Sequence, residues 1–211
     1  MKNIIFLAGY YGSGKTEIAL NLAIKNHVKY LVDLDIINPY FRAREAKHLL
    51  NETELISSDL QDDKYSDLPY LSKHIFKPFN QEHSTAIYDL GGNDLGAKVM
   101  RQFDDYSQTD FDLYFVINIY RNESNEFTKI LKLINQIEGS SGFKITGLIN
   151  NSNLMRETTY NDILEGEKIV SKISKLTGIP YIFNCIDEKI YDKSMELNNP
   201  IFLIHSYNLI K

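Results

Sequence analysis

The stretch from Gly9 to Thr16 carries the clearest chemistry in the chain. Its sequence is Gly-Tyr-Tyr-Gly-Ser-Gly-Lys-Thr, which fits the pattern G-x-x-x-x-G-K-[ST] at every position. In such a loop, glycines allow positive φ angles that turn backbone N–H groups toward a phosphate. The lysine reaches the terminal phosphates, and the hydroxyl after it ligates Mg²⁺. The residues that we expect to bind a nucleotide here are Gly9, Gly12, Ser13, Gly14, Lys15, Thr16 and Glu17.

A later acidic position, Asp89, follows the apolar residues 86–88. An aspartate that ends a buried strand downstream of a phosphate loop is typical of the carboxylate that holds Mg²⁺, directly or through a water molecule. Gly91 and Gly92 come shortly after it, and glycine lets the backbone approach the terminal phosphate closely. The alternative is that Asp89 and the two glycines merely end a strand.

Asp33 and Asp35 end another apolar stretch. Residues two apart in a strand point to the same face, so both carboxylates are expected on one side. We expect Asp35 to orient the attacking water or an Mg²⁺-bound water, while Asp33 holds that carboxylate or Lys15 in place. The predicted catalytic residues are therefore Lys15 and Asp35, and the predicted metal ligands are Thr16, Asp89 and Asp35. A simple turn-capping role for Asp35 is the alternative.

Arg42 and Arg44 follow closely in the sequence. Arginines in a loop past an active-site acid can supply charge to a transferring phosphoryl group or bind an acidic partner. They fit equally well on a solvent-exposed helix face beside Glu45.

Short apolar stretches alternate with helical patterns along the chain. Strands are expected at 3–8, 30–35, 84–89, 111–118, 143–150 and 181–183, and helices at 17–23, 42–50, 99–106, 127–137 and 162–176. This alternation predicts an α/β fold with a mostly parallel sheet covered by helices on both faces. Sites in such sheets lie at the carboxyl ends of the strands. The segment 51–81 is irregular, with one short strand expected at 74–76, and 201–204 is expected to form a terminal helix or an edge segment.

Composition narrows the function classes. The 211 residues, of which 43% are hydrophobic, are expected to form one domain, 1–211. The formal net charge of −5 and the absence of a basic patch give no indication of binding to nucleic acid or membrane. Cys185 is the only cysteine, which excludes an internal disulfide and argues against a cysteine-ligated metal. No apolar run is long enough to cross a membrane, so we expect a cytoplasmic protein.

Taken together, these motifs make the chain similar to the CobQ/CobB/MinD/ParA-type nucleotide-binding domains, the MinD-like branch of the P-loop NTPases. The resemblance implies a three-layer, Rossmann-like P-loop NTPase fold in which the Asp89 strand neighbours the loop strand. It also implies ATP and Mg²⁺ as ligands, with slow hydrolysis coupled to a partner. Asn150 matches the asparagine that contacts adenine, and the segment near Pro180 would line the base. Many members carry a second lysine where this chain has Tyr10.

That second lysine reaches the partner's nucleotide in a dimer that sandwiches ATP. Its absence argues against such a homodimer, unless Arg42 or Arg44 supplies the missing charge. The lone cysteine likewise argues against the iron–sulfur carriers of this branch.

Four functions remain open from the sequence. The leading one is an ATP-binding, Mg²⁺-dependent ATPase that switches a partner protein. The second is an ATP-dependent small-molecule kinase or ligase, with 51–81 covering the acceptor. A GTPase is the third, because residues 89–92 also fit D-x-x-G, although 150–153 lack the lysine and aspartate of N-K-x-D. The last is a nucleotide sensor that does not hydrolyse its ligand.

Overall fold

The computed structural model describes residues 2–35, 48–50, 52–57, 73–92, 94–106 and 111–207, and every structural statement below concerns these residues. Their strands form one eight-stranded sheet in the order β3-β2-β4-β1-β5-β6-β7-β8. All neighbouring strands are parallel. The strands are β1 (Ile4–Ala8), β2 (Tyr30–Leu34), β3 (Glu54–Ser57), β4 (Ala86–Leu90), β5 (Phe111–Ile117), β6 (Gly147–Asn150), β7 (Tyr181–Asp187) and β8 (Ile201–Ile204).

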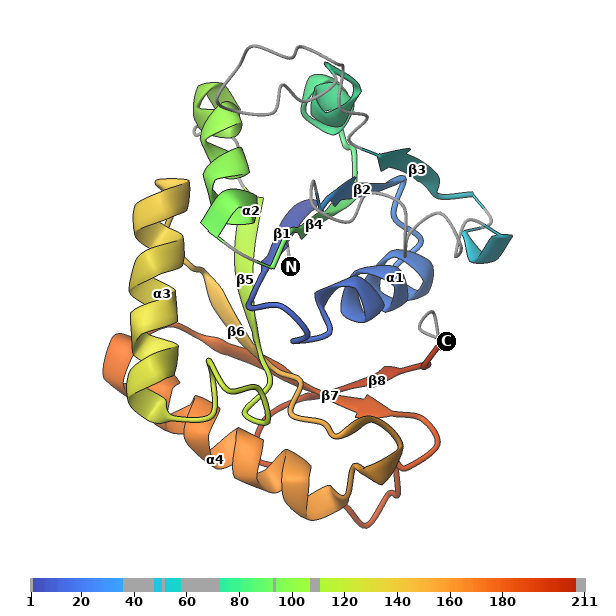
Figure 1. Cartoon of the computed structure of the whole chain (residues 1–211). Helices are drawn as coiled ribbons and strands as arrows, with labels where there is room; N and C mark the ends of the chain where they lie inside the picture. Colours follow the sequence, from blue (N-terminus) through green and yellow to red (C-terminus); the bar gives the residue numbers. More distant parts are fainter. Residues whose placement is uncertain are drawn as a thin grey trace.

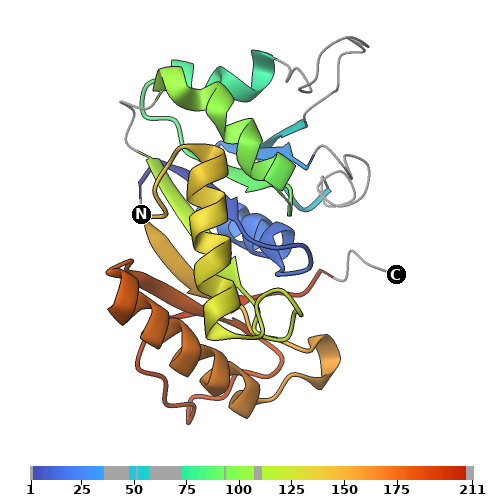
Figure 2. The same ribbon diagram turned by 60° about the vertical axis from the view of Figure 1, so that its left-hand side comes forward.

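Helices cover both faces of this sheet, as the sequence predicts (Figures 1 and 2). They are α1 (Lys15–Lys25), α2 (Asp94–Val99), α3 (Phe127–Ser141) and α4 (Tyr160–Thr177), with 3₁₀ helices η2 (Lys73–Asn80), η3 (Met100–Tyr106) and η4 (Met155–Glu157). Within this part of the chain, no helix has both the length and the apolar character needed to cross a membrane.

Alternating side chains of the strands divide the core into two layers. Ile5 and Leu7 of β1 pack on the side of α1, whereas Ile4 and Phe6 pack on the side of α2, α3 and α4. The two faces are both buried, which explains why β1 reads as a continuous apolar run rather than as an alternating one. The three-layer α/β prediction is confirmed.

The central position of β1 brings the acidic strand ends to the phosphate-loop motif. β1 lies between β4 and β5, and its Leu7 is the register partner of Asp89. On the next strand, Asp33 is the register partner of Asp89. Because all these strands are parallel, their carboxyl ends share one edge of the sheet. The prediction that the Asp89 strand neighbours the loop strand is therefore confirmed.

The irregular stretch 51–81 differs from its prediction in two ways. The expected strand at 74–76 is wrong, because these residues belong to η2. Ile75 is fully buried and its carbonyl accepts a hydrogen bond from the Tyr88 hydroxyl at 2.7 Å, while Phe76 packs against the ring of Phe103. Pro78 follows within the same turn and is unsuited to a central strand. In addition, β3 was not predicted, whereas the apolar segment 201–204 does form an edge strand.

Candidate functional site

The loop after β1 has the geometry of a phosphate cradle. Gly12 and Gly14 lie in the left-handed region, with φ angles of 76° and 89°, where glycine is strongly favoured. Gly14 precedes α1 and makes no side-chain cap, so the first N–H groups of that helix have no capping side chain. Lys15 is 7% exposed, and its Nζ donates to the Tyr10 carbonyl at 3.1 Å. An anion in this loop would meet a helix N-terminus and a buried ammonium group.

Thr16 and Asp89 join the loop to β4. The Thr16 hydroxyl donates to Asp89 Oδ2 at 2.6 Å, and Asp89 is 4% exposed. Asp33, its neighbour across the sheet, is 6% exposed. Two buried carboxylates at paired positions repel each other, so a nearby cation would stabilise both. This donor set of a hydroxyl and hard carboxylate oxygens fits Mg²⁺.

The described residues contain no cluster of three or more His, Cys, Asp or Glu side chains that could hold a metal ion. The described part of the chain therefore offers few metal ligands at this site. Mg²⁺ tolerates such a site because it usually keeps several waters and takes phosphate oxygens as further ligands. The arrangement suits Mg²⁺ bound together with a nucleotide rather than a metal held by protein alone.

The two aspartates after β2 have different roles. Asp33 Oδ1 accepts a hydrogen bond from the backbone N–H of Asp35 at 3.0 Å, so Asp33 shapes the turn that carries Asp35. Asp35 lies beside the segment that follows β4, because a methyl group added at Gly91 would be 3.4 Å from Asp35 Oδ1. Its expected action on water stays a prediction.

Gly92 brings the segment after β4 against the phosphate loop. A methyl group at this position would lie 2.7 Å from Tyr11 Cα and 3.2 Å from Lys15 Nζ. Real side chains do not approach a backbone so closely, so only glycine fits at position 92 without a backbone shift. The contact places backbone of this segment next to the lysine that is expected to reach a terminal phosphate.

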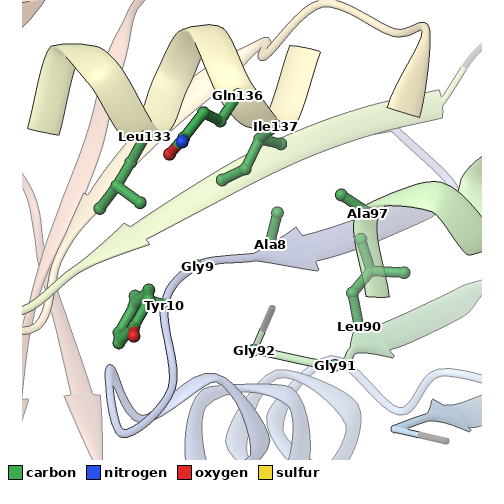
Figure 3. A pocket seen from close by; sticks show the side chains of 10 residues that line it. All are labelled: Ala8, Gly9, Tyr10, Leu90, Gly91, Gly92, Ala97, Leu133, Gln136 and Ile137. Carbon is green, nitrogen blue, oxygen red and sulfur yellow. The ribbon is translucent and has the colours of Figure 1, made fainter. Parts of the chain in front are cut away.

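A cavity of about 290 Å³ opens beside this contact (Figure 3). One side is formed by Ala8 at the end of β1 with residues 9 and 10 of the loop, and another by residues 90–92. Leu133, Gln136 and Ile137 of α3 line it as well, together with Ala97 of α2. None of the described residues that line the cavity carries a charge, and Gln136 is an uncharged polar group among mostly apolar neighbours.

Two residues that the sequence reasoning missed also contact the loop. Arg121 follows β5, and its Nε donates to the Gly12 carbonyl at 2.9 Å. Asn151 follows β6, and its Nδ2 donates to the Ser13 carbonyl at 2.7 Å. The signal for both was their place just past a strand end, at the same edge as the loop.

Asn150 lies at the predicted edge, but its side chain points into the protein and is fully buried. Its Nδ2 donates to Ile163 O at 3.1 Å and to Asn184 Oδ1 at 2.8 Å. Its Oδ1 accepts from both the amide and the hydroxyl of Ser152. All four hydrogen-bonding positions of the carboxamide are thus used within the protein. The predicted contact to the base stays untested, and the observed bonds favour a supporting role.

The structure corrects the prediction for Pro180. This residue directly precedes β7, and its carbonyl accepts the Leu148 N–H at the start of β6. Since β7 is parallel to the other strands, its beginning lies at the edge opposite the phosphate loop. A strand of seven residues separates the two edges, so Pro180 cannot line a base held near the loop. The residues after Asp187 lie at the correct edge instead.

Glu17 lies in the first turn of α1, as expected, but its carboxylate contacts the C-terminal segment. Its Oε1 accepts the backbone N–H of Tyr207 at 2.6 Å. One turn later, Asn21 bonds both the N–H and the carbonyl of His205. The acid therefore helps to hold the segment after β8 against α1. Arg42 and Arg44 lie outside the described residues.

No protein-family model matches the chain, and no curated protein matches it significantly in sequence. Solved structures, in contrast, do match the chain. The cell division protein FtsY from Thermotoga maritima has a TM-score of 0.55 and 18% identity, covering 88% of this chain and 62% of that one. The signal recognition particle receptor FtsY from Elizabethkingia anophelis has a TM-score of 0.51 and 14% identity, covering 94% and 63%. The same receptor in complex with GDP has a TM-score of 0.51 and 16% identity, covering 93% and 61%.

The fold is that of the P-loop NTPases. At these identities the similarity concerns the fold alone, and the chain spans less than two thirds of the FtsY chains that it matches. The narrower resemblance to MinD-like proteins stays a prediction.

Proposed function

We propose that this protein binds a purine nucleoside triphosphate with Mg²⁺ and hydrolyses it, so that the bound state switches a partner protein. The observation that carries the proposal is the 2.6 Å hydrogen bond between Thr16 and Asp89. It joins the predicted hydroxyl ligand of the loop to the predicted acid of β4, two residues that are 73 positions apart in sequence. Chance motif matches have no reason to meet in this way.

Each group of the site has a distinct role in this proposal. Mg²⁺, when bound, would neutralise charge on the phosphate oxygens, with Thr16 and Asp89 holding it directly or through water. The loop N–H groups and Lys15 bind phosphate and stabilise the charge that develops on it. Asp35 orients a water molecule near the terminal phosphate. The backbone at Gly92, which contacts the loop, follows the presence or absence of that phosphate.

Two observations bear on the base. The sequence resemblance and the lack of a carboxylate in 150–153 support ATP, because guanine recognition commonly uses an acid that accepts its N1–H and amino protons. The FtsY structure with GDP supports a guanine nucleotide. The proposal therefore extends to either purine, with ATP as the prediction from sequence.

The test combines binding and turnover. Calorimetry with ATP, GTP and their diphosphates, with and without Mg²⁺, identifies the base, and phosphate release measures hydrolysis. Lys15→Ala should lower turnover well beyond tenfold, because it removes a buried cation from the transition state. Lys168→Ala is the matched control, since Lys168 is exposed on α4 and forms a surface ion pair with Glu165 three residues before it. Equal turnover in wild type and Lys15→Ala would refute hydrolysis at this site, and tight binding without any phosphate release would identify a sensor.

The cavity favours one second function, phosphoryl transfer to a small acceptor. Its lining is uncharged and mostly apolar, and residues 91 and 92 belong both to the cavity and to the expected terminal-phosphate region. An acceptor there would be a neutral molecule with a hydroxyl group at the end near Lys15. Incubation with a γ-labelled triphosphate and a metabolite extract distinguishes the two functions. Label in an organic product supports transfer, whereas label only in inorganic phosphate supports hydrolysis.

A further inference from the structure

The loop between β5 and α3 makes a specific contact with the phosphate loop. Arg121 Nε donates to Gly12 O at 2.9 Å, and the guanidinium packs against Gly12, where an added methyl group would lie 3.3 Å from Nε. With the described residues, this is the only hydrogen bond that the Arg121 side chain makes. A charged side chain is thus used to hold one backbone carbonyl.

The neighbouring carbonyl is held from a different loop. Asn151 Nδ2 donates to Ser13 O at 2.7 Å. Asn151 is itself fixed, because its backbone N–H donates to Ile117 O at 2.7 Å. Two successive carbonyl groups of the phosphate loop therefore bind donors from two separate strand ends.

Hydrogen bonds from Asn118 connect the two segments that carry these donors. The fully buried Asn118 donates to Asn153 O at 3.1 Å, and its Oδ1 accepts the N–H of Tyr120 at 3.0 Å. The Tyr120 hydroxyl then donates to Asp162 Oδ1 of α4 at 2.6 Å. The segments that carry Arg121 and Asn151 are thereby connected to each other and to α4.

Fixing the carbonyl groups of the loop also fixes the directions of the N–H groups that follow them. The C=O and the following N–H of a planar trans peptide point in opposite directions. Holding Gly12 O therefore directs the Ser13 N–H away from Arg121, and holding Ser13 O directs the Gly14 N–H away from Asn151. The Ser13 N–H does point inward, where it donates to Tyr10 O at 3.1 Å. Lys15 Nζ donates to the same carbonyl, so the Ser13 N–H lies on the side of the loop that carries the lysine expected to reach a phosphate.

We propose that Arg121 and Asn151 are positioning residues that hold the loop carbonyls outward and so keep its N–H groups directed at the nucleotide. The inference rests on the proposed function, whose loop it concerns. A glycine-rich loop without this support samples many conformations, and the nucleotide must then order it on binding. Losing the support weakens di- and triphosphate binding alike, because the loop holds both, and leaves the chemical step nearly unchanged.

The test begins with nucleotide affinity. Arg121→Ala and Asn151→Ala should each raise the dissociation constants of the di- and triphosphate by roughly five- to tenfold, with kcat within about twofold of wild type. Arg156→Ala is the matched control, because it removes the same charge from an exposed position of η4 near the same edge. Arg121→Lys keeps the charge but places a methylene where Nε stands, so it should remain weakened.

Any of three results would overturn the inference. One is full rescue by Arg121→Lys, which would make charge alone responsible. Another is a fall in kcat at unchanged affinity, which would place Arg121 on the reacting phosphate instead. Affinities equal to wild type in both alanine variants would likewise refute it.

A readout without nucleotide separates this inference from the proposed function. Amide hydrogen exchange over residues 9–16 should be faster in Arg121→Ala and Asn151→Ala than in wild type and Arg156→Ala. Absence of nucleotide binding by the wild-type protein would refute the proposed function, while the exchange rates would still decide whether the two side chains hold the loop. Unchanged exchange in both variants would show that they do not.

Discussion

The contact between Gly92 and the phosphate loop gives the sharpest prediction, because one added methyl group tests it. In Gly92→Ala the new Cβ would lie 2.7 Å from Tyr11 Cα and 2.8 Å from Tyr11 N. Carbon atoms that are not bonded normally stay at least ~3.5 Å apart, so the two segments must separate by about 0.8 Å. Neither neighbour is the flexible end of a side chain, so the backbone itself has to move.

This displacement should affect turnover more than binding. The segment after β4 is expected to sense the terminal phosphate, and a misplacement of about 1 Å can cost roughly 100-fold in rate. We therefore expect triphosphate turnover in Gly92→Ala to fall by roughly 10-fold to 100-fold. Diphosphate affinity should stay within about threefold of wild type if the segment after β4 takes up the displacement, because the residues of the loop and of the start of α1 keep their identity.

Gly139→Ala is the matched control. Gly139 lies in α3, and a methyl group added there would have no neighbour within 4 Å. Alanine in place of a helical glycine should stabilise the protein by about 0.5–1 kcal/mol and leave turnover unchanged. Phosphate release, calorimetric binding of the diphosphate and thermal melting of both variants make the comparison. Turnover of Gly92→Ala within twofold of wild type would refute the reasoning.

Three further predictions follow from buried groups. Glu167 is 2% exposed; burial raises the pKa of its carboxyl, but hydrogen bonds from Asn199, Asn184 and Asn198 outweigh this and lower it below the ordinary value. The ionised Glu167 carboxylate therefore contributes its full stabilisation above the pKa of an ordinary glutamate. This stabilisation is lost as the pH falls through the lower pKa that Glu167 has in the folded protein. Glu167→Gln should lower the free energy of unfolding by about 2–3 kcal/mol at pH 7 and by progressively less at acidic pH. A loss that does not change with pH in denaturant titrations would contradict this. Phe103→Ala should cost ~3–5 kcal/mol in urea unfolding, because its ring is fully buried among aromatic neighbours. Asp89→Asn should keep the fold but reduce the gain in triphosphate affinity from Mg²⁺ by at least roughly tenfold in calorimetry, and an undiminished gain would exclude Asp89 from the metal site.

The local sequence was sufficient to predict the central strands and to locate the phosphate-loop motif, although β3 was missed and the strand expected at 74–76 is wrong. The loop motif and the apolar runs are contiguous, so β1, α1 and the acidic strand ends could be identified without knowing the fold. Parallel strands place their carboxyl ends together, which made the meeting of Thr16 and Asp89 predictable in outline.

Only the tertiary structure decided which polar residues reach the loop and which serve the core. Asn150 and Asn151 are adjacent and chemically identical, yet the Asn150 side chain hydrogen-bonds to Asn184 in the interior whereas the Asn151 side chain donates to the Ser13 carbonyl. The pleat of the strand and the packing of α4 make that choice, and no local pattern records it. Pro180 failed as a prediction because its distance from the loop depends on the direction of β7, and Arg121 was missed because its partner lies 109 residues away.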